Sequence, residues 1–119
     1  MRLLFQPDDL DQEWKSREVP YPSDRFGPHP TEPVGPSGTK AVNIVDLNQD
    51  GQLDMVNTCE GAIDGRSGVL WLEGPDWTPH DISGPDGIIF DRIEIFDIDT
   101  DGDEDVLTCE EATVVAGKR

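Results

Sequence analysis

A nine-residue acidic motif occurs twice in this chain, at positions 51 residues apart. Residues 46–54 and residues 97–105 both fit the pattern D-x-[DN]-x-D-G-x-x-D, and the second copy holds six carboxylates in nine positions. Self-similarity at a period of this size is typical of repeat proteins, in which each repeat is one supersecondary unit. The motif therefore predicts that the chain contains repeated copies of one structural unit.

Short apolar segments with strand spacing flank both copies of the motif. Val42 and Ile44 alternate with other residues before the first copy, and Ile93 and Ile95 do so before the second. A period of two is typical of a β-strand. We expect strands over residues 41–45, 55–60, 68–73, 77–83, 92–96 and 106–110, and a further one over residues 14–20, which resemble residues 77–83.

Glycine and proline separate these segments at short intervals, which indicates an all-β meander. Four strands in about 50 residues is the content of one four-stranded antiparallel β-propeller blade. We therefore predict an incomplete propeller. Residues 1–39 would hold the last strand of a preceding blade and a Pro/Gly-rich loop, residues 40–87 a complete blade, and residues 88–119 part of a second blade.

The predicted number of blades is too small for a closed propeller, which has about four to eight. We therefore expect the chain to be a fragment of a larger protein, or one of several copies that oligomerise to close a ring. The Pro/Gly-rich stretch from residue 20 to residue 38 would be a long loop between blades, with a disordered linker as the alternative.

Both acidic motifs supply the oxygen ligands that calcium prefers. Positions 1, 3, 5 and 9 offer side-chain oxygens, position 6 is a glycine that permits a sharp turn, and position 7 offers its main-chain carbonyl. The predicted calcium ligands are Asp46, Asn48, Asp50, Gln52, Asp54, Asp97, Asp99, Asp101, Asp103 and Asp105. Because clustered carboxylates repel one another, we expect two bound calcium ions; a solvated acidic loop is the alternative.

The loops differ from an EF-hand in two respects. An EF-hand loop ends in a bidentate glutamate at position 12, whereas Asn57 and Thr108 stand there in the two copies. The flanking residues are β-branched, which favours strands over helices. Magnesium fits less well than calcium because it keeps most of its waters.

The two motifs and their flanking segments resemble the FG-GAP/VCBS family of β-propeller repeats. The resemblance rests on residues 42–54 and 93–105, and on the strand-like segments 69–75 and 77–82. It implies a calcium-stabilised propeller that is extracellular or in the cell envelope and that acts as a non-catalytic adhesion, binding or scaffold module. Carbohydrate or protein would be its ligand. The alternative is an accessory propeller part of a secreted carbohydrate-active enzyme.

The net charge excludes several classes of partner. The chain has 26 acidic and 9 basic side chains, for a net charge of -17, whereas nucleic acids and anionic membranes need a basic surface. No apolar run approaches the roughly 20 residues of a membrane helix. The apolar residues 1–5 are too short for the hydrophobic region of a signal peptide, so we predict neither membrane insertion nor an export signal in this chain.

Nothing in the sequence indicates a catalytic centre, and we predict that the chain is not an enzyme. It has two histidines, no Gly-x-Ser-x-Gly motif and no zinc-ligand spacing. His29 would be solvated, and His80 would pack or form a structural hydrogen bond.

Tryptophans and cysteines have structural explanations. Trp14, Trp71 and Trp77 would pack between blades, with stacking on sugar rings as the alternative. Cys59 and Cys109 stand at nearly equivalent places in the two repeats. They would be two small buried thiols or a disulfide, and the sequence leaves both readings open.

Overall fold

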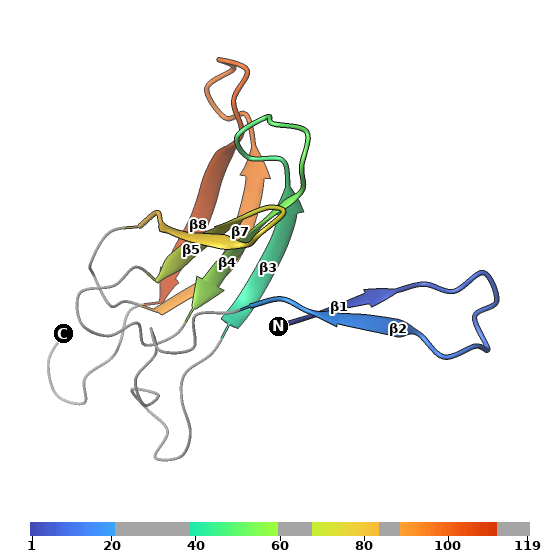
Figure 1. The fold of residues 1–119 in the computed structure, drawn as a ribbon. Coiled ribbons are helices and arrows are strands. Elements are labelled where there is room, and N and C mark those ends of the chain that lie inside the picture. The colour runs from blue at the N-terminus through green and yellow to red at the C-terminus, as the bar shows by residue number, and fades with distance from the viewer. Residues whose placement is uncertain (21–38, 60–67, 84–88, 112–119) are drawn as a thin grey trace, which may run out of the picture.

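The computed structural model describes residues 1–20, 39–59, 68–83 and 89–111, and the regular elements there are all β-strands (Figure 1). The strands are β1 (Arg2–Phe5), β2 (Lys15–Glu18), β3 (Thr39–Val45), β4 (Asp54–Cys59), β5 (Val69–Glu73), β6 (Thr78–Asp81), β7 (Ile89–Phe96) and β8 (Asp105–Glu111). The all-β prediction is confirmed. In these described ranges, no helix is long and apolar enough to cross a bilayer.

The strands form three antiparallel sheets in simple chain order. β3, β4, β5 and β6 make a four-stranded meander, while β1–β2 and β7–β8 are two-stranded. Each of the seven predicted strands corresponds to an observed one, and β1 was not predicted. The described residues thus contain one complete four-stranded sheet and two smaller sheets, and these three sheets do not close into a ring.

The 51-residue period is visible in the pairing of the strands. Ile44 lies opposite Met55 in the first repeat, and Ile95 lies opposite Val106 in the second. Both ladders also shift register at equivalent places, beside Lys40 and beside Asp91.

The two residues at these register shifts contact each other across the interface between the repeats. The Lys40 Nζ lies 3.1 Å from the Asp91 Oδ1. The two β-hairpins are therefore equivalent units, and one of them packs on the other.

On one side of the four-stranded sheet, which we call the Met55 face, the base of the β1–β2 hairpin packs against the sheet. Its buried cluster consists of Val19, Met55, Leu70 and Leu72, with Met1, Leu3 and Trp77 packed against it. The rest of the hairpin projects away from the sheet (Figure 1). Val42 and Ile44, on β3, remain exposed.

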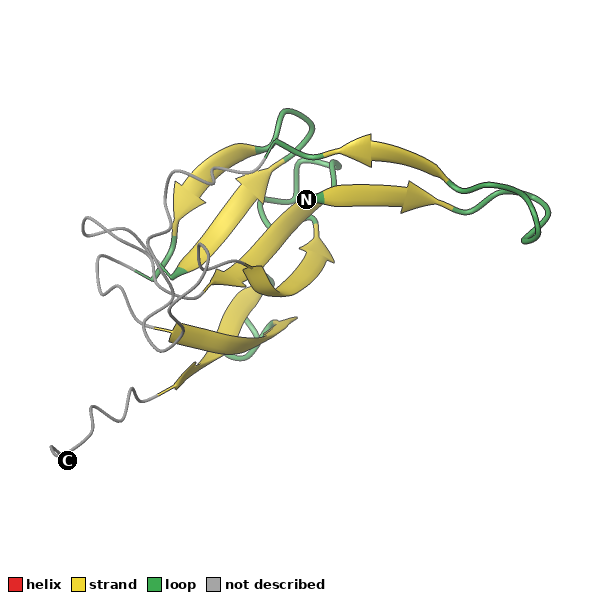
Figure 2. Ribbon diagram, turned by 90° about the horizontal axis from the view of Figure 1, so that it is seen from below, coloured by secondary structure: helices red, strands yellow, loops and turns green. Residues whose placement is uncertain are grey.

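The opposite side, which we call the Trp71 face, is covered by β7–β8. Its buried cluster consists of Val56, Val69, Phe90 and Ile93, with Ala41, Val45, Leu47, Trp71, Ile95 and Val106 packed against it. β7 contacts β3 and β4, so the second repeat covers this part of the face most fully, together with Val69 of β5. Figure 2 shows β1–β2 and β7–β8 on opposite sides of the four-stranded sheet.

Several side chains differ from their predicted surroundings. Trp71 and Trp77 pack against the two clusters, but Trp14 is 43% exposed because it precedes β2 in the projecting hairpin. Cys59 is buried and Cys109 is exposed, and no disulfide joins them. The predictions for residues 21–38, for His29 and for residues 112–119 lie outside the described residues.

Candidate metal centre

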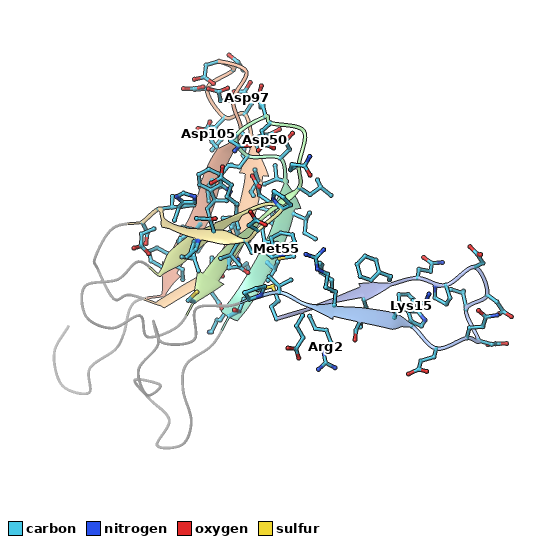
Figure 3. The ribbon with its side chains drawn as sticks, in the orientation of Figure 1. Arg2, Lys15, Asp50, Met55, Asp97 and Asp105 are labelled. Atoms are coloured by element: carbon cyan, nitrogen blue, oxygen red, sulfur yellow. The ribbon has the colours of Figure 1, made fainter. Side chains whose placement is uncertain are left out.

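The two acidic loops connect equivalent strands and lie at the same end of the molecule. The first joins β3 to β4 and the second joins β7 to β8; Figure 3 labels Asp50, Asp97 and Asp105 at this end. Both loops use left-handed backbone at matching positions: φ is +89° at Gly51 and +99° at Gly102. A glycine adopts such a φ at little cost, which explains the glycine at position 6 of the motif.

In the first loop, the side chain at position 1 holds the turn together. The Oδ1 of Asp46 accepts a hydrogen bond from the amide of Asp50 at 3.0 Å, and its Oδ2 accepts one from the amide of Gly51 at 2.8 Å. The Oδ1 of Asn48 also accepts from the amide of Asp50, at 3.2 Å, and the Oδ1 of Asp50 accepts from the amide of Gln52 at 2.8 Å.

The second loop repeats this pattern with equivalent atoms. Asp97 accepts from the amides of Asp101 and Gly102 at 3.1 and 2.9 Å. Asp99 accepts from the amide of Asp101 at 3.2 Å, and Asp101 accepts from the amide of Asp103 at 2.9 Å. The backbone of each loop is thus shaped by the side chains that the motif specifies.

Position 9 differs between the two copies. Asp54 is fully buried, and its carboxylate accepts hydrogen bonds from the amides of Leu47 at 3.1 Å and Gly74 at 2.7 Å. Asp105 is half-buried and accepts from the amide of Ile98 at 2.9 Å. The first loop is therefore tied to the end of β5 as well as to its own turn.

Three of the ten predicted ligands form a cluster that could hold a metal ion. Asp97, Asp99 and Asp105 each place one carboxylate oxygen within 4.8 Å of the others. This donor set suits a hard cation, which prefers oxygen ligands. Each carboxylate oxygen has two lone pairs, so it can accept an amide hydrogen bond and still bind an ion.

The other predicted ligands do not belong to this three-carboxylate cluster. In the first loop, Asn48 stands where the second has Asp99, so Asp46 and Asp54 are its only carboxylates at positions 1, 3 and 9. Asp50 accepts hydrogen bonds on both oxygens, from the Gln52 main-chain amide and the Asn48 side-chain amide, and Asp101 accepts one from the Asp103 main-chain amide. Gln52 and Asp103 are expected to bind through their main-chain carbonyls, and this expectation stays a prediction.

Sequence reasoning missed a side chain that links the two loops. The side-chain amide nitrogen of Gln49, Nε2, donates to the carbonyl of Gly102 at 2.8 Å and to the Oδ1 of Asp103 at 3.0 Å. Gln49 occupies a variable position of the motif. The pattern therefore contained no signal for its role, which depends on how the repeats pack.

A second missed residue, Glu73, connects the first loop to β6. Its Oε1 accepts a hydrogen bond from the side-chain amide of Asn48 at 3.0 Å, and its Oε2 lies 2.7 Å from the His80 Nε2. The His80 ring stacks on Trp71 with centroids 4.4 Å apart. His80 was predicted to pack or to form a structural hydrogen bond, and it does both.

The Gln49 contact gives a first prediction. Gln49→Ala removes two inter-loop hydrogen bonds at an exposed site, so we expect the free energy of unfolding to fall by about 1 kcal/mol. The matched control is Gln12→Ala, because Gln12 lies at the tip of the β1–β2 hairpin, far along the chain from both loops. Urea denaturation measures both variants, and equal stabilities would contradict a linking role for Gln49.

The chain has no match among known protein families, curated proteins or solved structures.

Proposed function

We propose that this chain is a calcium-binding segment of an FG-GAP/VCBS-type β-propeller, which acts as a non-catalytic binding, adhesion or scaffold module. The observation that carries the proposal is the cluster of Asp97, Asp99 and Asp105 in a loop whose turn hydrogen bonds recur at the same motif positions of the first loop.

Calcium is the cation that the donor set favours. The described ligands are carboxylate oxygens, with an amide oxygen at Asn48, whereas zinc and copper sites draw on nitrogen and sulfur. Magnesium demands a near-ideal octahedral shell and retains waters. The large negative charge of the chain, -17, also favours uptake of divalent cations.

The sheets support the propeller half of the proposal. A four-stranded antiparallel meander with a second repeat packed on its face is the local arrangement of two neighbouring blades. In this reading the acidic loops join the first and second strands of each blade. Exposed loops of this kind suit an extracellular module, whose calcium dissociation constant is about 0.1–1 mM.

Isothermal titration calorimetry tests the assignment of the sites. The chain should bind two calcium ions, and Asp99→Ala should reduce the stoichiometry to one, because it removes a clustered ligand. Asp8→Ala is the charge-matched control, since Asp8 is exposed in the β1–β2 loop, and it should still bind two. Undiminished binding by Asp99→Ala would contradict the proposed site.

A further inference from the structure

The projecting β1–β2 hairpin repeats the geometry of the β5–β6 hairpin. Leu3 lies opposite Arg17 in the first, and Trp71 lies opposite His80 in the second. A tryptophan precedes the second strand of each hairpin, Trp14 before β2 and Trp77 before β6. The residues align without a gap along both strands, although the connecting loops differ in length.

Both hairpins end with the same backbone hydrogen bond. The amide of Val19 donates to the carbonyl of Met1 at 2.9 Å, and the amide of Ile82 donates to the carbonyl of Val69 at 3.1 Å. β1–β2 therefore corresponds to the third and fourth strands of a four-stranded sheet. β7–β8 corresponds to the first and second strands, because its register repeats that of β3–β4.

These two hairpins are complementary halves that do not meet within one chain. In the described residues, β1 pairs with β2 alone and β8 pairs with β7 alone. The β1–β2 hairpin packs on the Met55 face and β7–β8 packs on the Trp71 face, so the four-stranded sheet separates them. We propose that β1 of a second copy of this chain pairs with β8 and completes a sheet in the order β7–β8–β1–β2.

The four-stranded sheet supplies the register of this pairing. β4 and β5 are antiparallel, with Val56 opposite Trp71 and Met55 opposite Leu72. At the equivalent positions, Leu107 lies opposite Leu3 of the second copy and Val106 lies opposite Leu4 of the second copy. Addition of a strand to an open edge in this way is a common mode of protein recognition.

An open cavity of about 530 Å³ lies where the added hairpin would pack. Its lining includes Trp71, His80, Ile82 and Val106. It lies between the Trp71 face at β5 and β6 and the start of β8. One repeat earlier, the equivalent space is filled.

The filled version is the buried cluster on the Met55 face, which contains Val19, Met55, Leu70 and Leu72. Ile82 and Val106 correspond in the cavity to Val19 and Met55. The counterparts of Leu70 and Leu72 are Arg2 and Leu4, and the second copy would supply them.

Exposure and charge agree with this occupant. Leu4 is 61% exposed in the single chain, and its burial in an apolar site is favourable. Arg2 is the one charged replacement in the cluster, and the cavity lining includes the exposed acidic residue Glu104. Its own-chain ion pair with Glu18, at 3.4 Å, is exposed and therefore weak.

The proposed contact is head-to-tail, because each copy offers one β1–β2 hairpin and one β8 edge. Such interfaces generate closed rings or open filaments. The pairing uses strand edges and apolar side chains, and it stands whether or not the acidic loops bind calcium.

Sedimentation equilibrium of the full chain tests the proposal. We expect a mass of two or more copies, which Leu4→Glu reduces to that of one copy. Leu10→Glu is the matched control: Leu10 is 62% exposed in the same hairpin but lies in its loop, and this variant should still assemble. Circular dichroism confirms that each variant is folded. A folded wild-type monomer, or equal masses for the two variants, would overturn the proposal.

Cross-linking tests the register independently of the fold of Leu4→Glu. Leu3→Cys and Leu107→Cys, prepared separately with Cys109→Ser and then mixed, should form a disulfide-linked pair of chains, because opposite residues of paired strands lie within disulfide range. Leu10→Cys in place of Leu3→Cys should not. Equal cross-linking by Leu3→Cys and Leu10→Cys would refute the register. A wild-type monomer whose β8 amides are protected from hydrogen exchange would show that another part of the same chain covers the edge of β8.

Discussion

We expect excess EDTA to lower the Tm of the calcium-saturated chain by more than about 10 °C. A ligand that binds only the folded state stabilises it by RT ln(1 + [L]/Kd), or about 2.7 kcal/mol per site when its concentration is 100 times Kd. The candidate site at Asp97, Asp99 and Asp105 requires the loop to be folded, so its binding energy becomes folding energy. In a domain of this size, each kcal/mol moves Tm by about 4 °C.

The control for this experiment is a chain that cannot bind at the second loop. EDTA should lower the Tm of Asp99→Ala by less than that of the wild type, because only the first loop still binds calcium. EDTA should lower the Tm of the double variant Asn48→Ala/Asp99→Ala by little more than a degree. Thermal scans followed by circular dichroism, at one protein concentration, measure all three chains. An EDTA-independent Tm for the wild type would refute a structural role for calcium.

Strand positions could be predicted from the sequence because local patterns specify them. Alternating apolar residues and Gly/Pro punctuation indicated β3 to β8 to within a few residues of their observed bounds. β1 was missed for a physical reason. Arg2–Phe5 lacks alternating apolar residues. Its strand conformation depends on pairing with β2, which follows only after a long irregular loop.

The packing of the repeats was beyond the sequence, because it depends on which face of each strand is covered. Ile93 and Val42 hold equivalent motif positions, yet Ile93 is buried and Val42 is exposed. The difference lies in their neighbours. The first sheet covers Ile93, while the base of the β1–β2 hairpin packs on side chains of β4 and β5. A pattern in one strand does not specify such contacts.

The candidate site shows the same division. The motif identified ligand types and the glycine turn, and the structure assembles three of the carboxylates. The motif could not show that Gln49 would bond to the second loop, or that Glu73 would orient the Asn48 side-chain amide. Both contacts join residues far apart in sequence, and neither lies at a specified motif position.

The second large effect concerns Asp54, the one fully buried carboxylate of the two loops. Asp54→Ala leaves the amides of Leu47 and Gly74 without their acceptor. An unsatisfied buried donor costs about 1–3 kcal/mol, and a charged acceptor contributes more than a neutral one. We therefore expect Asp54→Ala to lower the free energy of unfolding by about 3 kcal/mol.

Asp105→Ala is the matched comparison, because Asp105 occupies the same motif position in the second repeat. It accepts from Ile98 alone and is only half-buried, so its loss should cost about 1 kcal/mol. Urea denaturation in EDTA, at one fixed protein concentration, removes any contribution from metal ligation. Equal costs for the two variants would mean that Asp54 serves the loop alone; the larger cost that we expect would show that it also anchors the end of β5, through Gly74, to the acidic loop.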